Sequence, residues 1–262
     1  MPNITLNSVQ LYYESHGSGD EAIVLFNGIT MNTTGWLWQL PALLQQRRVI
    51  LLDFRGQGKS EHPVCEAYSL DQQADDVAAL MSALGIEKFD VLGLSYGGMV
   101  ALHMAQRHLA RIKRLVLAST LAYADAANEA IKASWLEIMQ CGGQDLRFVA
   151  SVPWLYGSRF IESQRAVLEQ IRAQGVDIDW PAVVRLMNGV SEHDARPWLS
   201  SIVVPTLILA GDEDRLTPPY QARHLALTIP DALLVELTGY GHALHIEAPL
   251  QFNEALTSFL FS

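Results

Sequence analysis

The chain has 262 residues, of which 50% are hydrophobic and 18% charged, and this composition predicts one globular α/β domain with room for an inserted subdomain. The formal net charge of −10 argues against a nucleic-acid partner, because its phosphates would be repelled. No apolar run reaches the about 18 residues of a membrane span. The two cysteines and the lack of a basic-then-apolar leader predict a cytoplasmic protein.

The first sixty residues predict a hairpin followed by two buried strands. The hairpin covers residues 4–15, where two stretches of alternating polarity flank a polar turn. Continuous apolar runs predict strands over residues 22–26 and 48–53, with a helix over residues 36–46 between them. The glycine-rich loop at residues 53–60 lacks the spacing of the Walker phosphate loop. We therefore interpret it as a tight surface turn.

A strand and a helix then flank the motif around which the chain is organised. Ser69 is predicted to cap a helix that reaches Leu84, with Gln72 in the capping-box position. The apolar run at residues 89–92 predicts a buried strand, and the residues after Gly98 have helical spacing. Between the two lies Gly93-Leu94-Ser95-Tyr96-Gly97-Gly98. This is the Gly-x-Ser-x-Gly form of a nucleophile elbow.

The glycines of this motif have a physical reason. A strand that turns directly into a helix forces its corner residue, here Ser95, into strained backbone angles, and the residues two positions away must lack bulk. Gly93 and Gly97 provide that room, while Gly98 lets the helix lie close to the neighbouring strands. The Ser95 hydroxyl would then stand clear of the sheet as the candidate nucleophile.

A segment without a clear strand follows the strand predicted over residues 115–118. Residues 123–198 show only helical patterns and contain four of the six tryptophans. One interpretation is a helical subdomain whose aromatic residues form its own small core. The other is a lid over the elbow, with some aromatic residues facing an apolar pocket. Both can hold, and we expect a core at residues 1–122 and 199–262 with a lid between.

The last part of the chain returns to alternating strands and helices. Strands are predicted over residues 206–210 and 233–237, with helices after Pro219 and over residues 248–260. Repeated strand–helix units of this kind predict a mostly parallel sheet covered by helices on both faces.

A serine nucleophile needs a base, and histidine is the usual one. Of the eight histidines, His242 is favoured because it lies in a short loop after the last strand, at the sheet edge where catalytic groups gather. His245 is the nearest competitor and ranks lower, because it is predicted to open the final helix. His103 and His108 follow Ser95 on its helix and are predicted to point away from the elbow.

The orienting acid should also follow a strand. Asp212, Glu213 and Asp214 crowd the loop after the strand at residues 206–210. An acid here gives the chain order Ser, acid, His of the α/β-hydrolase triad. Position alone leaves Asp212 and Asp214 in competition.

Across nearly its whole length the chain resembles the α/β-hydrolase family. The matching pieces are Asn27-Gly28-Ile29, Asp53-x-Arg-Gly-x-Gly-x-Ser60, the elbow, Gly211-Asp-Glu-Asp214 with Pro218, and Gly241-His242. The resemblance implies a mostly parallel central sheet flanked by helices, with a helical lid insertion. It also implies that Asp214 is the acid and that the backbone N–H groups of Ile29 and Tyr96 form the oxyanion hole.

One residue departs from the common pattern of that family. Most members have His where this chain has Asn27, and Asn there resembles some enol-lactonases and the carrier-protein-dependent hydroxyacyl transferases of lipid synthesis. This leaves a carrier protein open as a partner. Ser95 at the elbow excludes the haloalkane dehalogenases and epoxide hydrolases of this fold, which use Asp. No His, Cys or carboxylate group shows metal-ligand spacing, so no metal or other cofactor is expected.

These observations predict a serine hydrolase that cleaves an ester, lactone or thioester of a small, largely apolar acid through an acyl-Ser95 intermediate. Acyl transfer to an alcohol or thiol, cofactor-free carbon–carbon hydrolysis or perhydrolysis, and a binding protein without catalysis remain open as alternatives. Apolar residues after the oxyanion loop and in the lid, with Asn27, are expected to line the pocket for a small-molecule substrate. They are Asn27, Met31, Trp36, Trp135, Met139, Trp154, Tyr156 and Met187.

Overall fold

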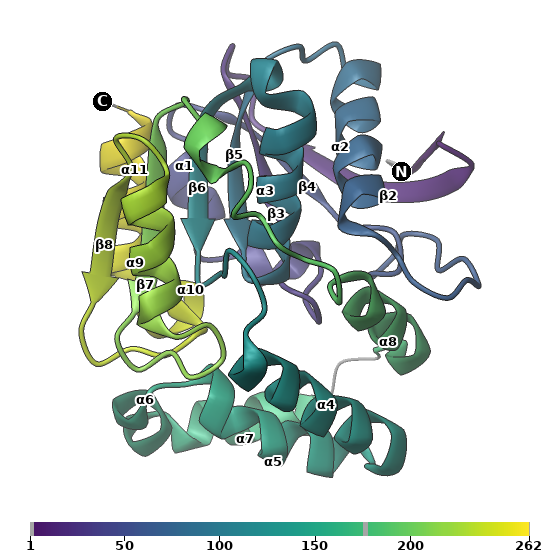
Figure 1. Cartoon of the computed structure of the whole chain (residues 1–262), viewed down its shortest axis with the longest axis vertical. Helices are drawn as coiled ribbons and strands as arrows, with labels where there is room; N and C mark the ends of the chain where they lie inside the picture. The colour runs from purple at the N-terminus through teal and green to yellow at the C-terminus, as the bar shows by residue number, and fades with distance from the viewer. Residues whose placement is uncertain (1–2, 175–177, 262) are drawn as a thin grey trace.

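An eight-stranded sheet forms the centre of the computed structural model, which describes residues 3–174 and 178–261 (Figure 1). Its strand order is β1-β2-β4-β3-β5-β6-β7-β8. The strands are β1 (Asn3–Leu6), β2 (Val9–His16), β3 (Ala22–Phe26), β4 (Arg48–Leu52), β5 (Phe89–Leu94), β6 (Ile112–Ala118), β7 (Thr206–Gly211) and β8 (Leu233–Leu237). β2 pairs antiparallel with β1 and β4, and the other neighbours pair in parallel. The predicted hairpin and mostly parallel sheet are confirmed.

Helices cover both faces of the parallel strands. Along β3, Val24 and Phe26 point to one face while Ile23 and Leu25 point to the other, as the period of a strand requires. The helices packed on the first face are α2 (Leu70–Ala83), α3 (Tyr96–His108) and α9 (Pro219–Thr228), and those on the second are α1 (Leu40–Leu43), α10 (Leu244–Glu247) and α11 (Pro249–Leu260). Strands buried on both sides need apolar residues at nearly every position, which explains the continuous apolar runs.

The helix predicted over residues 36–46 is wrong in its extent. The structure has a 3₁₀ turn, η1 (Thr33–Trp36), and then the single-turn α1 (Leu40–Leu43). Pro41 is the cause, because its ring lacks an N–H and would collide with the carbonyl four residues earlier in a continuous helix. Proline is favoured in the first turn of a helix, and that is where it lies in α1.

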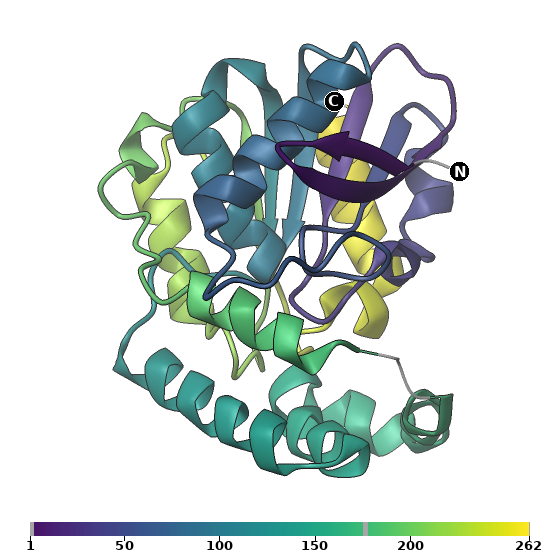
Figure 2. The same cartoon turned by 90° about the vertical axis from the view of Figure 1, so that its right-hand side faces the viewer.

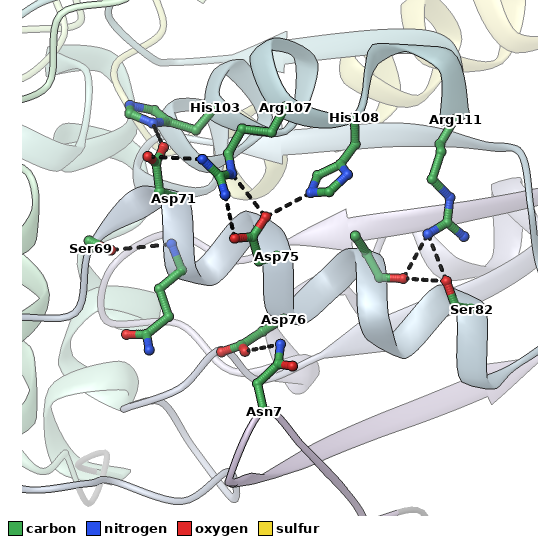
Figure 3. Close-up of polar contacts among 12 residues, drawn as sticks. Asn7, Ser69, Asp71, Asp75, Asp76, Ser82, His103, Arg107, His108 and Arg111 are labelled. Atoms are coloured by element: carbon green, nitrogen blue, oxygen red, sulfur yellow. Dashed lines mark hydrogen bonds and ion pairs between the residues drawn. The ribbon is translucent and has the colours of Figure 1, made fainter.

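α2 begins at the predicted cap and is tied to the N-terminal hairpin (Figure 3). Ser69 Oγ accepts the Gln72 N–H at 3.2 Å. In the middle of the helix, Asp76 accepts a hydrogen bond from Asn7 of the hairpin turn at 2.9 Å. Asp76 also receives two hydrogen bonds from the buried guanidinium of Arg55, at 3.0 and 3.1 Å. These contacts fix the hairpin and the loop after β4 to the same helix.

A seam of polar contacts joins α2 to α3 on the outer side of the molecule (Figure 3). Arg107 on α3 donates to both Asp71 and Asp75 on α2. The ring of His103 lies 2.6 Å from Asp71, and that of His108 lies 2.8 Å from Asp75. Both histidines therefore face α2, and the prediction that they point away from the elbow is confirmed.

Five helices lie between β6 and β7, and the described part of this segment contains no named strand. They are α4 (Ala126–Cys141), α5 (Gln144–Leu155), α6 (Ser158–Ser163), α7 (Arg165–Gln174) and α8 (Trp180–Gly189). Figures 1 and 2 show α4 to α7 as a layer beyond the carboxyl ends of the parallel strands. The two ends of the segment meet, because Ala195 N–H donates to the Ala122 carbonyl at 2.7 Å and Tyr123 pairs with Asp194. We call this segment the helical insertion.

The remaining short elements are two 3₁₀ turns, η2 (Leu109–Arg111) and η3 (Leu199–Ser201). Over the described ranges, no helix combines the length and the hydropathy needed to cross a membrane.

Candidate active site

Ser95 lies at the corner between β5 and α3 with backbone angles that few residues adopt. Its φ is 55° and its ψ is −115°, outside the regions that are comfortable for a residue with a side chain. The surroundings hold it there. Its N–H donates to the Ala118 carbonyl at 2.9 Å, and its own carbonyl accepts from Thr120 Oγ1 at 2.8 Å. The strained corner is therefore anchored to the end of β6 on both sides of the serine.

The structure explains the three glycines of the elbow. A Cβ on Gly93 would lie 2.4 Å from the Gly97 carbonyl oxygen, and one on Gly97 would lie 2.2 Å from the Phe26 carbonyl oxygen. A Cβ on Gly98 would lie 2.5 Å from Thr120. These distances are far below van der Waals contact, and two of the obstacles are backbone atoms. The sequence predicts that Gly98 lets the helix lie close to the neighbouring strands, and the group it approaches is Thr120, two residues after the end of β6.

The structure brings Ser95, His242 and Asp214 together in one hydrogen-bonded row. Ser95 Oγ lies 2.9 Å from His242 Nε2. On the other side of the same ring, Nδ1 lies 2.8 Å from Asp214 Oδ2. The three residues come from the ends of different strands, β5, β8 and β7, so only the parallel topology places them side by side.

Asp214 is buried and held by three hydrogen bonds besides its contact with His242. The N–H groups of Leu216 and Thr217 donate to Oδ1 at 2.9 and 2.8 Å, and Thr217 Oγ1 donates to Oδ2 at 2.7 Å. Asp212 is exposed and accepts the Gly239 N–H at 2.6 Å. Of the two competing carboxylates, Asp214 is thus the one that reaches the histidine. Sequence reasoning missed Thr217.

The competitor His245 lies buried beside the site and contacts Trp36, with ring centroids 5.7 Å apart. Burial, with a smaller contribution from the nearby His242 ring, lowers the pKa of His245 to about 3. A histidine that stays uncharged against an indole is a packing residue, which agrees with its lower rank.

Glu247 is a site residue that the sequence did not reveal. Its carboxylate accepts the Gly241 N–H at 3.1 Å and the Gly157 N–H at 2.8 Å, so it joins the His242 loop to the end of α5. Burial raises the pKa of Glu247. The two glycines are close enough that a Cβ on Gly241 would lie 2.5 Å from Gly157 N. This contact positions the histidine loop against the helical insertion.

The N–H groups of Ile29 and Tyr96 are the expected oxyanion donors, and both residues line the cavity that contains Ser95. Within the described residues, no acceptor bonds to either N–H. Tyr96 is the first residue of α3, where the helix dipole adds positive character. The Gln57 amide donates to the Gly28 and Ile29 carbonyls at 2.9 and 3.1 Å. Gln57 thereby orients the loop that carries Ile29.

The role of Gln57 corrects the interpretation of residues 53–60 as a surface turn. Asp53, Arg55 and Gln57 are buried, and Asp53 accepts the N–H groups of Thr33 and Lys59 at 2.8 and 2.9 Å. The loop folds inward because its polar side chains satisfy backbone groups of the neighbouring oxyanion loop. Local spacing could not predict these long-range partners.

Two apolar cavities are lined by residues of the helical insertion, and one of them contains Ser95. The first, of about 110 Å³, contains Ser95 and is lined by Ile29, Tyr96, Met99, Leu121, Trp135 and Met187 among others. The second, of about 210 Å³, is lined by Trp135, Met139, Phe148, Leu155 and Tyr156 among others. Trp135 lines both. Four of the expected pocket residues, Trp135, Met139, Tyr156 and Met187, therefore lie on these cavities.

The other four expected pocket residues lie elsewhere. Asn27 and Trp36 are fully buried, because Asn27 accepts the Trp36 indole N–H and donates to the Leu52 carbonyl, both at 2.8 Å. Met31 turns its sulfur to the Gly28 N–H at 3.2 Å and lines a separate small cavity. Trp154 on α5 lines neither apolar cavity.

The described residues contain no group of three or more His, Cys, Asp or Glu that could hold a metal ion.

Residues 21–140 and 182–249 match the family model described as alpha/beta hydrolase fold. The chain belongs to the α/β-hydrolase family. This hydrolase is similar along its length to a protein of Azorhizobium caulinodans that is provisionally named a carbamate hydrolase (RutD). The two sequences are 32% identical, and the match covers 99% of this chain and 98% of the relative.

Solved structures of the same family are also similar. An enol-lactonase from Burkholderia xenovorans superposes with a TM-score of 0.91 at 30% identity, and each chain is covered completely. A thermophilic esterase from Thermogutta terrifontis gives 0.88 at 28% identity, covering 99% of this chain and 97% of the other. The resemblance inferred from the motifs is thereby confirmed.

Proposed function

We propose that this α/β hydrolase is a serine hydrolase that cleaves an ester, lactone or thioester of a small, largely apolar acyl group. The observation that carries the proposal is the row Ser95 Oγ, His242, Asp214, with contacts of 2.9 and 2.8 Å, opening on an apolar cavity. A serine hydroxyl paired with an oriented histidine is the arrangement that activates it as a nucleophile.

The proposed reaction has two halves. Ser95 Oγ attacks the carbonyl carbon as His242 Nε2 takes its proton, and the negative charge that develops on the carbonyl oxygen is stabilised by the N–H groups of Ile29 and Tyr96. His242 then gives the proton to the leaving alcohol or thiol, and the acyl group stays on Ser95. In the second half His242 deprotonates water, which attacks the acyl carbon and releases the acid.

Asp214 and its partners set the state of the histidine in this scheme. Asp214 Oδ2 accepts the proton on His242 Nδ1, which leaves Nε2 free to accept the Ser95 proton. The bonds from Leu216 and Thr217 hold the carboxylate in place. A fixed tautomer and a fixed ring orientation are what the carboxylate contributes.

We assign residues 123–198 as a lid that selects the acyl group, with residues 1–122 and 199–262 as the core. The lid assignment is supported by the cavity next to Ser95, because residues of the insertion such as Trp135 and Met187 line it. The matched family positions stop at residue 140 and resume at residue 182, so α5 to α7 lie outside them. The part most distant from the family pattern is therefore the part that encloses the second cavity.

Carbamate hydrolysis, provisionally assigned by name to relatives about 30% identical, is the competing function. It would use the same nucleophile and the same oxyanion donors. A small carbamate needs little apolar space, whereas about 210 Å³ of cavity lies beyond Trp135. This volume favours a substrate with a longer acyl group.

A substrate panel separates these functions. Purified wild type and Ser95→Ala would be assayed on aryl esters of graded acyl length, on lactones, on acyl thioesters and on aryl carbamates. We expect wild type to prefer esters or lactones over carbamates and Ser95→Ala to lose turnover while keeping its fold. Hydrolysis by Ser95→Ala at the wild-type rate would refute the proposal. Product analysis with an added alcohol or thiol would detect acyl transfer.

A further inference from the structure

The second cavity carries positive charge in a chain whose net charge is −10. Among the residues that the structure describes, its charged lining residues are Arg147 and Arg172, and no Asp or Glu lines it. Arg172 is neutralised locally, because its guanidinium lies 2.9 Å from Asp145 and 3.8 Å from Glu169. Arg147 has no carboxylate within 4.0 Å among the described residues. The cavity therefore contains one cationic group without a counter-charge from the described part of the chain.

The Arg147 guanidinium is held in position. It lies over the Trp180 ring, with 4.5 Å between the guanidinium carbon and the ring centroid, and Nη2 donates to the Met139 carbonyl. Its Nε–H is buried and bonds to no acceptor among the described residues. A fixed cation with a free donor is suited to receive an anion, since little side-chain entropy remains to be lost on binding.

A second free donor belongs to a residue that lines the same cavity. Trp135 Nε1 is buried and also lacks an acceptor within the described ranges, and Trp135 lines both this cavity and the one that contains Ser95. Buried N–H groups without a partner are rare, and each costs about 1–3 kcal/mol. Two of them in side chains that line one apolar cavity favour a ligand group that accepts hydrogen bonds.

We propose that Arg147 and Trp135 bind an ionised carboxylate at the far end of the substrate's acyl group. The preferred substrate is then an ester or lactone whose acyl chain ends in a second carboxylate. This inference rests on the proposed function, since the acyl carbon must lie at Ser95. The chain passes Trp135, and its methylenes contact apolar side chains such as Ile138, Phe148 and Leu155. The carboxylate accepts the Arg147 Nε–H and the Trp135 indole N–H.

A substrate pair tests the inference directly. Wild-type kcat/KM would be measured for mono-aryl esters of adipic, suberic and sebacic acid and for the aryl n-alkanoates of the same chain length. We expect the acid-terminated ester to be preferred at one of these lengths. Arg147→Met should reduce the ratio of the two kcat/KM values by about 10- to 100-fold, as the loss of a hydrogen bond to a charged group implies. Trp135→Phe should lower the same ratio by a smaller factor.

A matched control keeps the comparison specific. Arg165 also lies in the helical insertion but is exposed and lines neither cavity, so Arg165→Met removes the same charge and should leave the ratio unchanged. A wild type that hydrolyses the alkanoate at least as well as its acid-terminated partner at every length would overturn the inference. An equal fall for both substrates in Arg147→Met would do the same. Should Arg147→Met not fold, the wild-type preference and Trp135→Phe still decide.

Binding separates failure of this inference from failure of the proposed function. Calorimetry with adipate, suberate and sebacate would be done on Ser95→Ala and on Ser95→Ala with Arg147→Met. Dicarboxylate binding that is lost with Arg147 supports the carboxylate site even if no ester is hydrolysed. Ester hydrolysis without any preference for a terminal carboxylate, and without this binding, refutes the site while leaving the serine hydrolase intact.

Discussion

Replacing Asp214 by Asn tests the orienting role of the acid with almost no change in shape. Oδ1 receives two backbone N–H groups, from Leu216 and Thr217, so the amide oxygen of Asn must take that position. The amide NH₂ then replaces Oδ2 and faces His242 Nδ1. Because NH₂ can only donate, the imidazole must turn Nδ1 into an acceptor and move its proton to Nε2. Nε2 can then no longer accept the Ser95 proton.

The expected loss in kcat is about 10⁴-fold, the size of the same change in the serine-protease example of this tautomer effect. Steady-state kinetics on an aryl ester would measure it, with a matched loss in kcat/KM because the defect lies in the chemical step. Asp212→Asn is the control, because Asp212 is exposed and contacts Gly239 instead of His242. Its loss should be small. Equal activities of Asp214→Asn and Asp212→Asn, or the reverse ranking, would refute the reasoning.

Three further perturbations are expected to act through the fold around the site. Gly97→Ala puts a Cβ 2.2 Å from the Phe26 carbonyl oxygen, so urea unfolding should show a loss of about 1–3 kcal/mol. Gly143→Ala, where none of the described atoms beyond the chain neighbours lies within 4 Å of the added Cβ, should lose less. Gln57→Leu removes the two bonds that orient the Ile29 loop. It should lower kcat by roughly 10- to 100-fold, and because it leaves two carbonyls without this donor it should also lower the unfolding free energy by about 1–3 kcal/mol. An unchanged kcat would contradict the role given to Gln57. Burial lowers the pKa of His193 from 6.5 to about 4. The unfolded chain therefore binds a proton that the folded chain does not, and stability present above pH 6.5 is lost as the pH falls toward 4. When the pH falls from 7 to 4.5, the unfolding free energy of His193→Gln should decrease by about 2–3 kcal/mol less than that of wild type. Parallel curves of unfolding free energy against pH for the two proteins would refute this.

The sequence predicted the features that depend on local patterns or on topology. Buried parallel strands show up as apolar runs. The elbow glycines form a local motif, although Gly97 and Gly98 are required by the close approach of Phe26 and Thr120. His242 could be found because parallel strands bring their carboxyl ends to one edge, whatever the packing of side chains. Asp214 could be chosen over Asp212 only through the family resemblance, and the structure places it next to the histidine.

The features that sequence did not predict depend on contacts between distant segments. The Asn27 side chain hydrogen-bonds to the Trp36 indole and to the Leu52 carbonyl, so it is not available to a substrate. Gln57 supports a loop almost thirty positions earlier, which the glycine-rich spacing around it does not indicate. In the helical insertion, an aromatic residue can face the cavity or the insertion's own core. Helical spacing alone would place Trp154 on the same face as residues 147, 150 and 151, and the structure is needed to show that it lines neither cavity.

The central claim is that the acyl group passes through a covalent bond to Ser95. Wild-type enzyme mixed with an aryl ester would be quenched in acid during turnover, digested and analysed by mass spectrometry, alongside His242→Ala and Ser95→Ala. We expect wild type to carry the acyl mass on the peptide that contains Ser95, and Ser95→Ala to carry none. Turnover in Ser95→Ala, or an acyl group found on another residue, would contradict the account.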